Sequence, residues 1–168
     1  MTTPPSKKNL GELLASVKDL TQRIGRQTHA GAAMLVGAAL DRTLEDALTI
    51  RMVQLNREMR DKLFGEYGTL RNFSAKIDLA FALGLVDRQN YKSLTAIRKC
   101  RNLFAHSRDL LSFESSDIRS LLELSTEKLT AVKTIEDFIS AGESIEAHVT
   151  HAAGMQLAGS VGKLRAEL

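Results

Sequence analysis

The sequence predicts an all-α protein: a single-domain bundle of five to seven helices, with one long helix at its centre. Leucine and alanine, both good helix formers, are present in 25 and 19 copies. Apolar residues recur at steps of three and four, and no segment shows the sustained apolar–polar alternation of a half-buried strand. The length of 168 residues suits one hydrophobic core.

Two helices are predicted in the N-terminal part of the chain. Asn9 is a suitable cap for a short helix over about 10–24, and Gly25 is suited to end it. A longer helical pattern follows over about 28–63. Its early part is rich in alanine and glycine, and such small residues let another helix approach closely. The sequence therefore predicts that this long helix is the central, buried one.

Capping residues mark two further helices in the middle of the chain. Ser74 predicts the start of a helix over about 75–83, and Gly84 stands where a helix-ending glycine belongs. Asp87 predicts the cap of a second helix over about 88–106. This pair, joined by a short turn, is the best candidate for a helix-turn-helix. The length and apolar arc of its second helix instead favour a core helix, which leaves direct DNA binding open.

The C-terminal third is predicted to begin with a loop over 107–115. Ser115 or Ser116 then opens a helix that runs on, or bends, through the apolar residues that follow. The last stretch has several glycines in a weak helical pattern. We therefore expect one all-α domain over 1–141 and a marginal C-terminal helix or tail over 142–168.

Composition excludes several classes of protein. Cys100 is the single cysteine, so an internal disulfide and a thiolate-cluster zinc site are excluded. The N-terminus lacks an apolar signal core, and no stretch approaches the length of an apolar membrane span, so a cytoplasmic location away from membranes is expected. His148 and His151 have a spacing that can bind a metal, but no third ligand is fixed beside them. No metal and no cofactor is expected.

The charge is unevenly distributed along the chain, although the net charge is only +3. Residues 64–113 contain eight basic and four acidic side chains, whereas residues 114–168 contain five basic and nine acidic ones. This polarity is compatible with an anionic ligand in the middle of the chain. It is equally compatible with head-to-tail pairing of two subunits, or with pairing of the two parts within one chain.

The predicted helix over 88–106 has two contrasting faces. Its apolar arc, which must face the core, consists of Ala96, Ile97, Cys100, Leu103 and Phe104. The other side gathers side chains that can bind a ligand or a partner: Tyr91, Arg98, Arg101, Asn102 and His106. Arginine can fork onto a phosphate or carboxylate, and histidine can move a proton near neutral pH.

Two interpretations of this polar face are open. Arg101 and His106 are about 140° apart on a regular helix, so they converge on one ligand only if the helix ends near Ala105 or if a second subunit supplies the other half. In the structural interpretation, Arg98 or Arg101 instead pairs with a carboxylate of the long helix, and Asn102 and His106 satisfy backbone groups at the helix end. The candidate carboxylates are Asp41, Glu45 and Asp46.

Two runs resemble the mannitol operon repressor family: Phe73–Leu85 (FSAKIDLAFALGL) and Ile97–Ser107 (IRKCRNLFAHS), with a weaker similarity over Ala39–Glu45. The resemblance extends over about residues 30–140. It implies an all-α bacterial regulator that represses genes for sugar-alcohol uptake and utilisation. We also expect a homodimer, and a regulatory role that runs through a protein partner or a bound effector.

The run Arg101–His106 (RNLFAH) also resembles the arginine–polar–three-residue–histidine pattern of HEPN domains, many of which are metal-independent ribonucleases that act as dimers. This resemblance implies that His106 is the acid or base at a ribose hydroxyl and that Arg101 holds the scissile phosphate. Asn102 would orient either group. The alternative function is thus an RNA-cleaving enzyme or toxin component, and a third is a purely structural interaction module.

Overall fold

The computed structural model describes residues 28–52, 55–107 and 109–166, with side chains as far as Gly154. Within these ranges the chain forms seven helices and no strand, which confirms the prediction of an all-α bundle. The predicted helix over 10–24 lies outside the described residues. None of the described helices is long and apolar enough to cross a membrane. The helices are α2 (His29–Arg51), α3 (Arg57–Phe64), α4 (Phe73–Ala82), α5 (Arg88–His106), α6 (Ser116–Glu123), α7 (Glu127–Thr130) and α8 (Ile135–Ala166).

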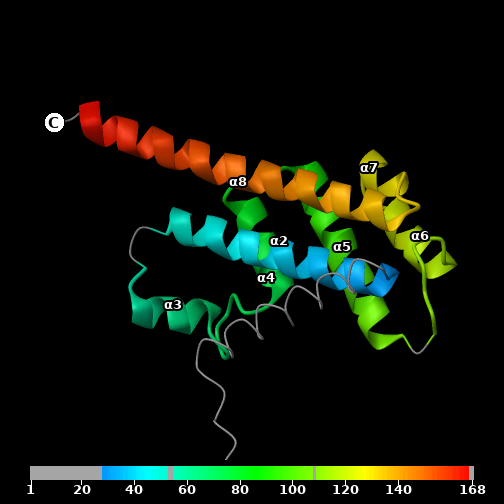
Figure 1. Cartoon of the computed structure of the whole chain (residues 1–168). Coiled ribbons are helices and arrows are strands. Elements are labelled where there is room, and N and C mark those ends of the chain that lie inside the picture. The colour runs from blue at the N-terminus through cyan, green and yellow to red at the C-terminus, as the bar shows by residue number, and fades with distance from the viewer. Residues whose placement is uncertain (1–27, 53–54, 108, 167–168) are drawn as a thin grey trace, which may run out of the picture.

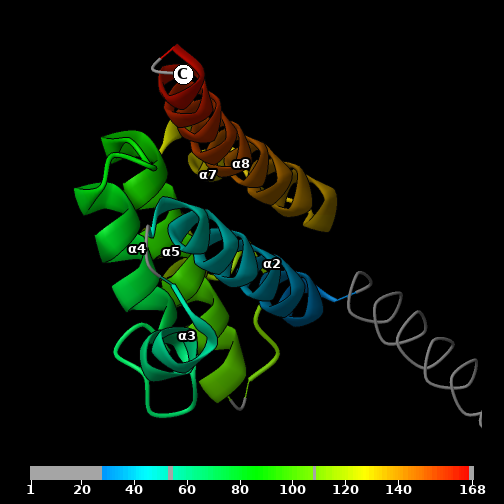
Figure 2. The ribbon, with the colours of Figure 1, turned by 90° about the vertical axis from the view of Figure 1, so that its left-hand side faces the viewer.

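Helix α2 is the central element of the bundle. It packs along α8 on one side and against α4 and α5 on the other (Figures 1 and 2). Its buried residues are small or branched, among them Ala32, Ala33 and Gly37, so its neighbours approach closely. The predicted central helix is therefore confirmed in its position in the fold.

The predicted length of that helix, over 28–63, is wrong. Thr28 caps α2 by accepting a hydrogen bond from the Gly31 amide at 3.0 Å, and α2 ends at Arg51. A new helix, α3, starts after Asn56, whose Oδ1 accepts from the Met59 amide at 2.8 Å. An asparagine in this position satisfies a free amide of the new helix and so favours a break in the apolar pattern.

The turn between α4 and α5 agrees closely with the sequence. Gly84 has φ +71°, and the amides of Gly84 and Leu85 donate to the carbonyls of Phe81 and Ala80 at 3.0 and 2.9 Å. This double hydrogen bond is a Schellman motif, which needs a left-handed residue and therefore favours glycine. Asp87 then caps α5 by accepting from the Asn90 amide at 2.7 Å. Helix α4 begins at Phe73, one residue before the predicted cap.

In the C-terminal third, a single helix, α8, crosses the position at which we expected a marginal helix or tail to begin. The chain breaks between α6, α7 and α8, and the Asp137 carboxylate accepts from the Lys133 and Thr134 amides where α8 begins. Helix α8 then runs unbroken through residue 142, so the expected boundary between 1–141 and 142–168 falls inside a helix. Gly142, Ile145 and other residues of this part are buried beside α2. The small residue lets the two helices pack closely at this point.

Replacing Gly142 by alanine is expected to destabilise the protein by about 1–3 kcal/mol. A Cβ atom there would lie 2.5 Å from Val36 Cγ1, and the β-branched valine has little freedom to move aside. Gly154→Ala in the same helix is the control, because a Cβ there meets nothing within 4 Å. The control is expected to raise the free energy of unfolding by up to about 1 kcal/mol, because alanine favours a helix more than glycine does. Urea unfolding measures both, and equal stabilisation by the two changes would contradict the close packing of α2 and α8.

Candidate functional site

The two faces of α5 separate as the sequence predicts. Ala96, Ile97, Cys100 and Phe104 are buried, and Leu103 packs against them in part. Burial raises the pKa of the Cys100 thiol to about 12, so this thiol stays protonated and is unsuited to act as a nucleophile. The opposite face has half-buried and exposed polar side chains. The chemistry available on α5 therefore lies on that face.

Arg101 is half-buried, and its position is defined on three sides. Its aliphatic part crosses α2 at Gly37, where an added Cβ would lie 2.7 Å from Arg101 Cδ. Its guanidinium lies over the Phe73 ring of α4, 5.5 Å from the centroid. Nε and Nη2 donate to Asn102 Oδ1 at 3.3 and 3.1 Å. The absence of a side chain at Gly37 thus makes room for this arginine, and the ring and the amide orient it.

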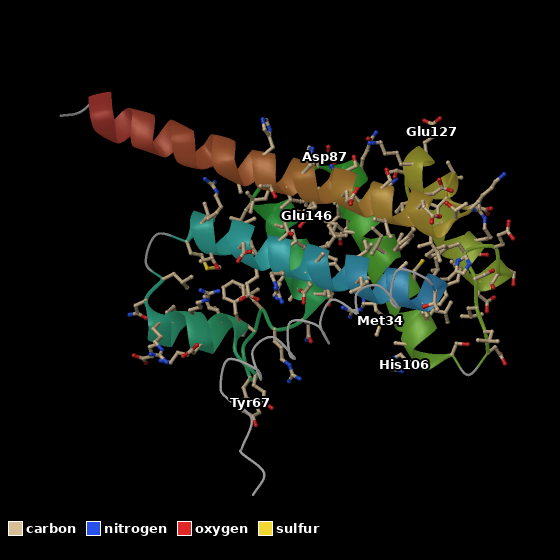
Figure 3. The ribbon with its side chains drawn as sticks, viewed as in Figure 1. Met34, Tyr67, Asp87, His106, Glu127 and Glu146 are labelled. Carbon is tan, nitrogen blue, oxygen red and sulfur yellow. The ribbon has the colours of Figure 1, made fainter. Side chains whose placement is uncertain are left out.

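Asn102 and His106 are less closely associated than their i, i+4 spacing suggests. The side-chain oxygen of Asn102, Oδ1, accepts hydrogen bonds from Arg101. No hydrogen bond joins the Asn102 side chain to His106 in the described structure. His106 is the last residue of α5, and its exposed side chain lies at the end of the helix away from α8 (Figure 3). The interpretation in which His106 satisfies backbone groups of the following loop is not supported, because its imidazole makes no such bond to a described residue.

Tyr91 belongs to a different part of α5. Its hydroxyl donates to Asp78 Oδ1 at 2.9 Å, and its ring contacts that of Phe81 with centroids 4.7 Å apart. The hydrogen bond with Asp78 and the negative charge of that carboxylate raise the pKa of Tyr91. Tyr91 and His106 are fifteen residues apart, about 22 Å along a helix. The expected set of Tyr91, Arg98, Arg101, Asn102 and His106 is therefore not one cluster, because a straight helix spreads it.

The carboxylates that we expected opposite the arginines of α5 pair with a lysine of α4. Lys76 is only 4% exposed, and its Nζ lies 2.8 Å from Glu45 Oε2 and 3.1 Å from Asp41 Oδ1. The first contact is a hydrogen bond, whereas the second is an ion pair without hydrogen-bond geometry. Glu45 is also 3.5 Å from Arg60 of α3. The predicted ion pairs from Asp41 or Glu45 to Arg98 or Arg101 are thus wrong.

This pairing changes what Arg101 can do. Sequence reasoning missed it because Lys76 lies on the apolar face of α4, between Phe73 and Ile77, where a charged residue is unusual. With Lys76 holding both carboxylates, Arg101 forms no ion pair with a described residue. A guanidinium has five N–H donors, and Asn102 uses two of those of Arg101. Among the described residues the remaining donors have no partner, and they can bind an anion such as a phosphate or carboxylate.

Helix α5 is enclosed over much of its length. Ser93 is buried, and its hydroxyl lies 2.8 Å from that of Thr126, in the turn before α7. Leu94 and Ile97 are fully buried in the core. A recognition helix that enters a DNA groove must protrude from its domain. The burial confirms the predicted core role of α5, which is unfavourable for a helix-turn-helix formed by α4 and α5.

No three His, Cys, Asp or Glu side chains of the described residues gather in a metal-binding arrangement. Comparisons of the chain with protein-family models, with curated proteins and with solved structures give no match.

Proposed function

We propose that the chain is a transcriptional regulator of the mannitol operon repressor type, which controls sugar-alcohol uptake and utilisation genes. The support is that the three segments resembling that family contact one another. Ala39–Glu45 of α2 and Phe73–Leu85 of α4 meet at the Lys76 ion pairs, and Ile97–Ser107 of α5 joins them where Arg101 lies over Phe73. Distant segments that resemble one family and also touch are what a shared fold requires.

The regulator acts as a homodimer and through a protein partner or a bound effector. Helix α5 is a core helix, so it does not supply a protruding DNA reader. If the protein contacts DNA directly, phosphate contacts make the affinity fall steeply with salt. A salt titration with promoter DNA distinguishes this from a route through a partner.

Deleting the gene in its own bacterium is expected to raise the transcript levels of sugar-alcohol uptake genes in the absence of their substrates. Complementation with the wild-type chain restores repression, and complementation with Ser120→Ala, an exposed position on α6, does so equally. Transcript levels that do not respond to the deletion would contradict the regulatory role. Light scattering of the purified chain tests the dimer separately.

The alternative function is metal-independent RNA cleavage, and one observation favours it: Arg101 is oriented and has no carboxylate partner in the described structure. In this proposal His106 accepts the proton of a ribose 2′-hydroxyl, and the 2′-oxygen bonds to phosphorus as the bond from phosphorus to the 5′-oxygen breaks. The leaving 5′-oxygen takes up a proton from a water molecule. Arg101 stabilises the negative charge that grows on the phosphate. A second subunit supplies the other half of the site.

His106→Ala and Arg101→Gln are each expected to lower the rate of single-stranded RNA cleavage by about a hundredfold or more. His151→Ala is the matched control, because His151 is an exposed histidine on α8. Gel analysis of a labelled RNA follows the reaction. Cleavage that persists equally in all variants, or no cleavage by the wild-type chain, would exclude this alternative and leave the regulatory proposal intact.

A further inference from the structure

A groove follows the seam between α2 and α8. Two hollows of about 230 and 240 Å³ form it, and both are lined by Glu146. Its α2 wall extends from Leu35 to Ile50, and its α8 wall extends from Ile139 to Ala153. Leu35 and Ile50 are fifteen residues apart, which is about 22 Å along a helix. The groove therefore has the length of a helix of about four turns.

The lining of this groove is apolar and acidic. Its apolar residues include Leu35 and Ile139, which are half-buried, and Ile50, which is 42% exposed. Its charged residues are Asp46, Glu143 and Glu146, and no basic side chain of the described residues lines it. Glu146 accepts a hydrogen bond from Thr43 Oγ1 at 2.9 Å, across the seam (Figure 3). Such a surface fits an amphipathic helix that has basic residues beside its apolar face.

The chain has a segment of this kind in its own sequence, shortly before α2. The predicted helix over 10–24 gathers six apolar side chains within an arc of about 120°. They are Leu10, Leu13, Leu14, Val17, Leu20 and Ile24. Residues 1–27 contain five basic and two acidic side chains, and Lys18 falls at the border of the apolar arc. A helix of fifteen residues is marginal in water on its own, so this arc needs a surface to cover it.

The connection to α2 is long enough for the segment to reach the groove of its own chain. Residues 25–27 can span about 10 Å when extended. The groove starts at Leu35, six residues after the start of α2 at His29, or about 9 Å along the helix. Connections of two to eight residues commonly join helices that pack side by side. The segment can therefore turn back and run antiparallel to α2.

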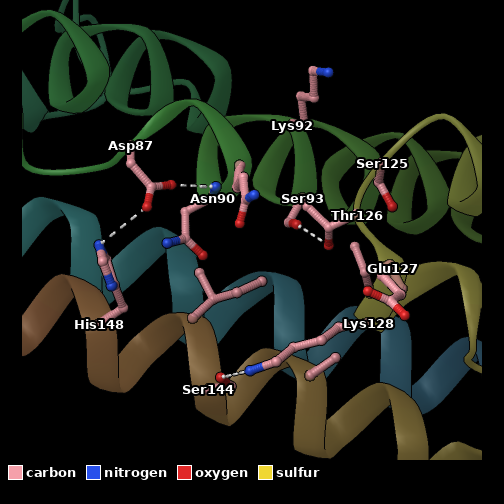
Figure 4. Close-up of a pocket in the computed structure, with 14 residues that line it drawn as sticks. Asp87, Asn90, Lys92, Ser93, Ser125, Thr126, Glu127, Lys128, Ser144 and His148 are labelled. Atoms are coloured by element: carbon pink, nitrogen blue, oxygen red, sulfur yellow. Dashed lines mark hydrogen bonds and ion pairs between the residues drawn. The ribbon is translucent and has the colours of Figure 1, made fainter.

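Two other hollows of the described structure fit a basic amphipathic helix less well. The hollow between α5 and α6 is lined by Lys92 and Lys99 and by no acidic residue, so it repels a basic segment. A polar cavity of about 610 Å³ lies between the start of α5, α7 and α8 (Figure 4). The three apolar residues of its lining are all buried, and Lys128 crosses it to donate to Ser144 Oγ at 2.8 Å. It offers no open apolar strip.

We propose that the groove between α2 and α8 is the docking surface of the chain's own segment 10–24, which binds there as an amphipathic helix antiparallel to α2. The apolar arc of the segment covers Leu35, Ile50 and Ile139, and its basic side chains lie near Asp46 and Glu143. The inference depends neither on the regulatory role nor on RNA cleavage.

Paramagnetic relaxation enhancement in the isotope-labelled full chain tests this docking. The natural cysteine, Cys100, is buried, so a nitroxide reagent reacts at the cysteine introduced by Ala38→Cys, an exposed position beside the groove. We expect this label to broaden the backbone amide signals of residues 10–24 strongly. Leu124→Cys is the matched label position, because Leu124 is 77% exposed and lines the hollow between α5 and α6. Its label should broaden the same signals much less.

Reversing the charge of the groove tests its chemistry. Asp46→Lys combined with Glu143→Lys is expected to speed hydrogen exchange of the amides in 10–24 by about fivefold, because two attractive contacts become repulsive. Glu66→Lys combined with Glu114→Lys is the control, since it makes the same change of net charge at exposed positions outside the groove. Leu13→Glu combined with Leu20→Glu should abolish the broadening by the Ala38→Cys label, because it removes apolar contacts.

The proposal is overturned if the label at position 38 leaves residues 10–24 unaffected, or if the labels at 38 and 124 broaden them equally. It is also overturned if the groove and control charge reversals give the same exchange rates. Mixing spin-labelled chain with isotope-labelled chain that has no spin label identifies a segment supplied by a second copy. Broadening in that mixture would exclude docking within one chain. The transcript and RNA assays are independent of these measurements, so failure here leaves their outcomes unaffected.

Discussion

Replacing Phe113 by alanine is expected to lower the free energy of unfolding by about 3–5 kcal/mol, the largest effect of any change considered. Phe113 lies in the loop between α5 and α6, yet it is fully buried. Its ring centroid is 4.8 Å from that of His29, 5.6 Å from that of Phe104 and 4.5 Å from that of Phe138. Its amide also donates to His29 Nδ1 at 3.3 Å. One side chain therefore joins the start of α2, the end of α5 and the start of α8.

Urea unfolding followed by circular dichroism measures this effect. Leu110→Ala is the control, because Leu110 is in the same loop and is 105% exposed. The control is expected to change stability by no more than about 0.5 kcal/mol. Phe113→Leu keeps most of the buried volume, so its loss of stability should lie between those of Phe113→Ala and Leu110→Ala. A loss below about 1 kcal/mol for Phe113→Ala would mean that the loop does not belong to the core.

Lys76→Met is expected to lower the free energy of unfolding by about 3 kcal/mol, because it leaves two carboxylates close together without their buried cation. Asp41 and Glu45 are then held beside each other at the α2–α4 contact with only Arg60 nearby. Adding Asp41→Asn and Glu45→Gln to Lys76→Met removes both charges and is expected to recover much of the loss. Lys62→Met is the control, because Lys62 forms an exposed ion pair with Glu58. This change should lower the free energy of unfolding by no more than about 0.5 kcal/mol.

The same ion pairs predict how stability depends on pH. Burial alone raises the pKa of Glu45, but the hydrogen bonds and charges of Lys76 and Arg60 outweigh it and hold this pKa below the usual 4.5. Stability from such a carboxyl is complete above its unfolded-state pKa and is lost as the pH falls through its lower folded-state pKa. The wild-type chain should therefore lose stability below about pH 4.5. In Lys76→Met we expect a higher pKa of Glu45. The difference in stability between the wild type and the variant should therefore become smaller in acid.

An equal stability difference at neutral and acid pH would contradict this account of Lys76. It would show that the variant loses packing of the lysine stem and not charge compensation. Loss of the contact between Lys76 Nζ and the Phe64 ring, whose centroid is 5.9 Å away, would be a further effect that does not depend on the carboxylates.

The candidate site illustrates how far the sequence could be used. The helical period correctly separates the buried arc of α5 from the face with Arg101 and His106, because side-chain direction along a helix depends only on position. The partner of each charged side chain could not be predicted in the same way. Asp41 and Glu45 face Lys76, and Arg101 lies over Gly37 and Phe73. Which side chains meet depends on how α2, α4 and α5 cross. The roles in gene regulation or RNA cleavage remain predictions.

By itself, the sequence determined the helical class of the protein and the elements whose signals are local. Gly84 and Asp87 marked the turn before α5, because a left-handed glycine and a capping carboxylate act on backbone groups within a few residues. Only the tertiary structure decided that Phe113 belongs to the core, that α8 continues past Gly142, and that a polar cavity forms between α5, α7 and α8. Each of these features depends on contacts between segments distant in the chain, and no local pattern specifies them.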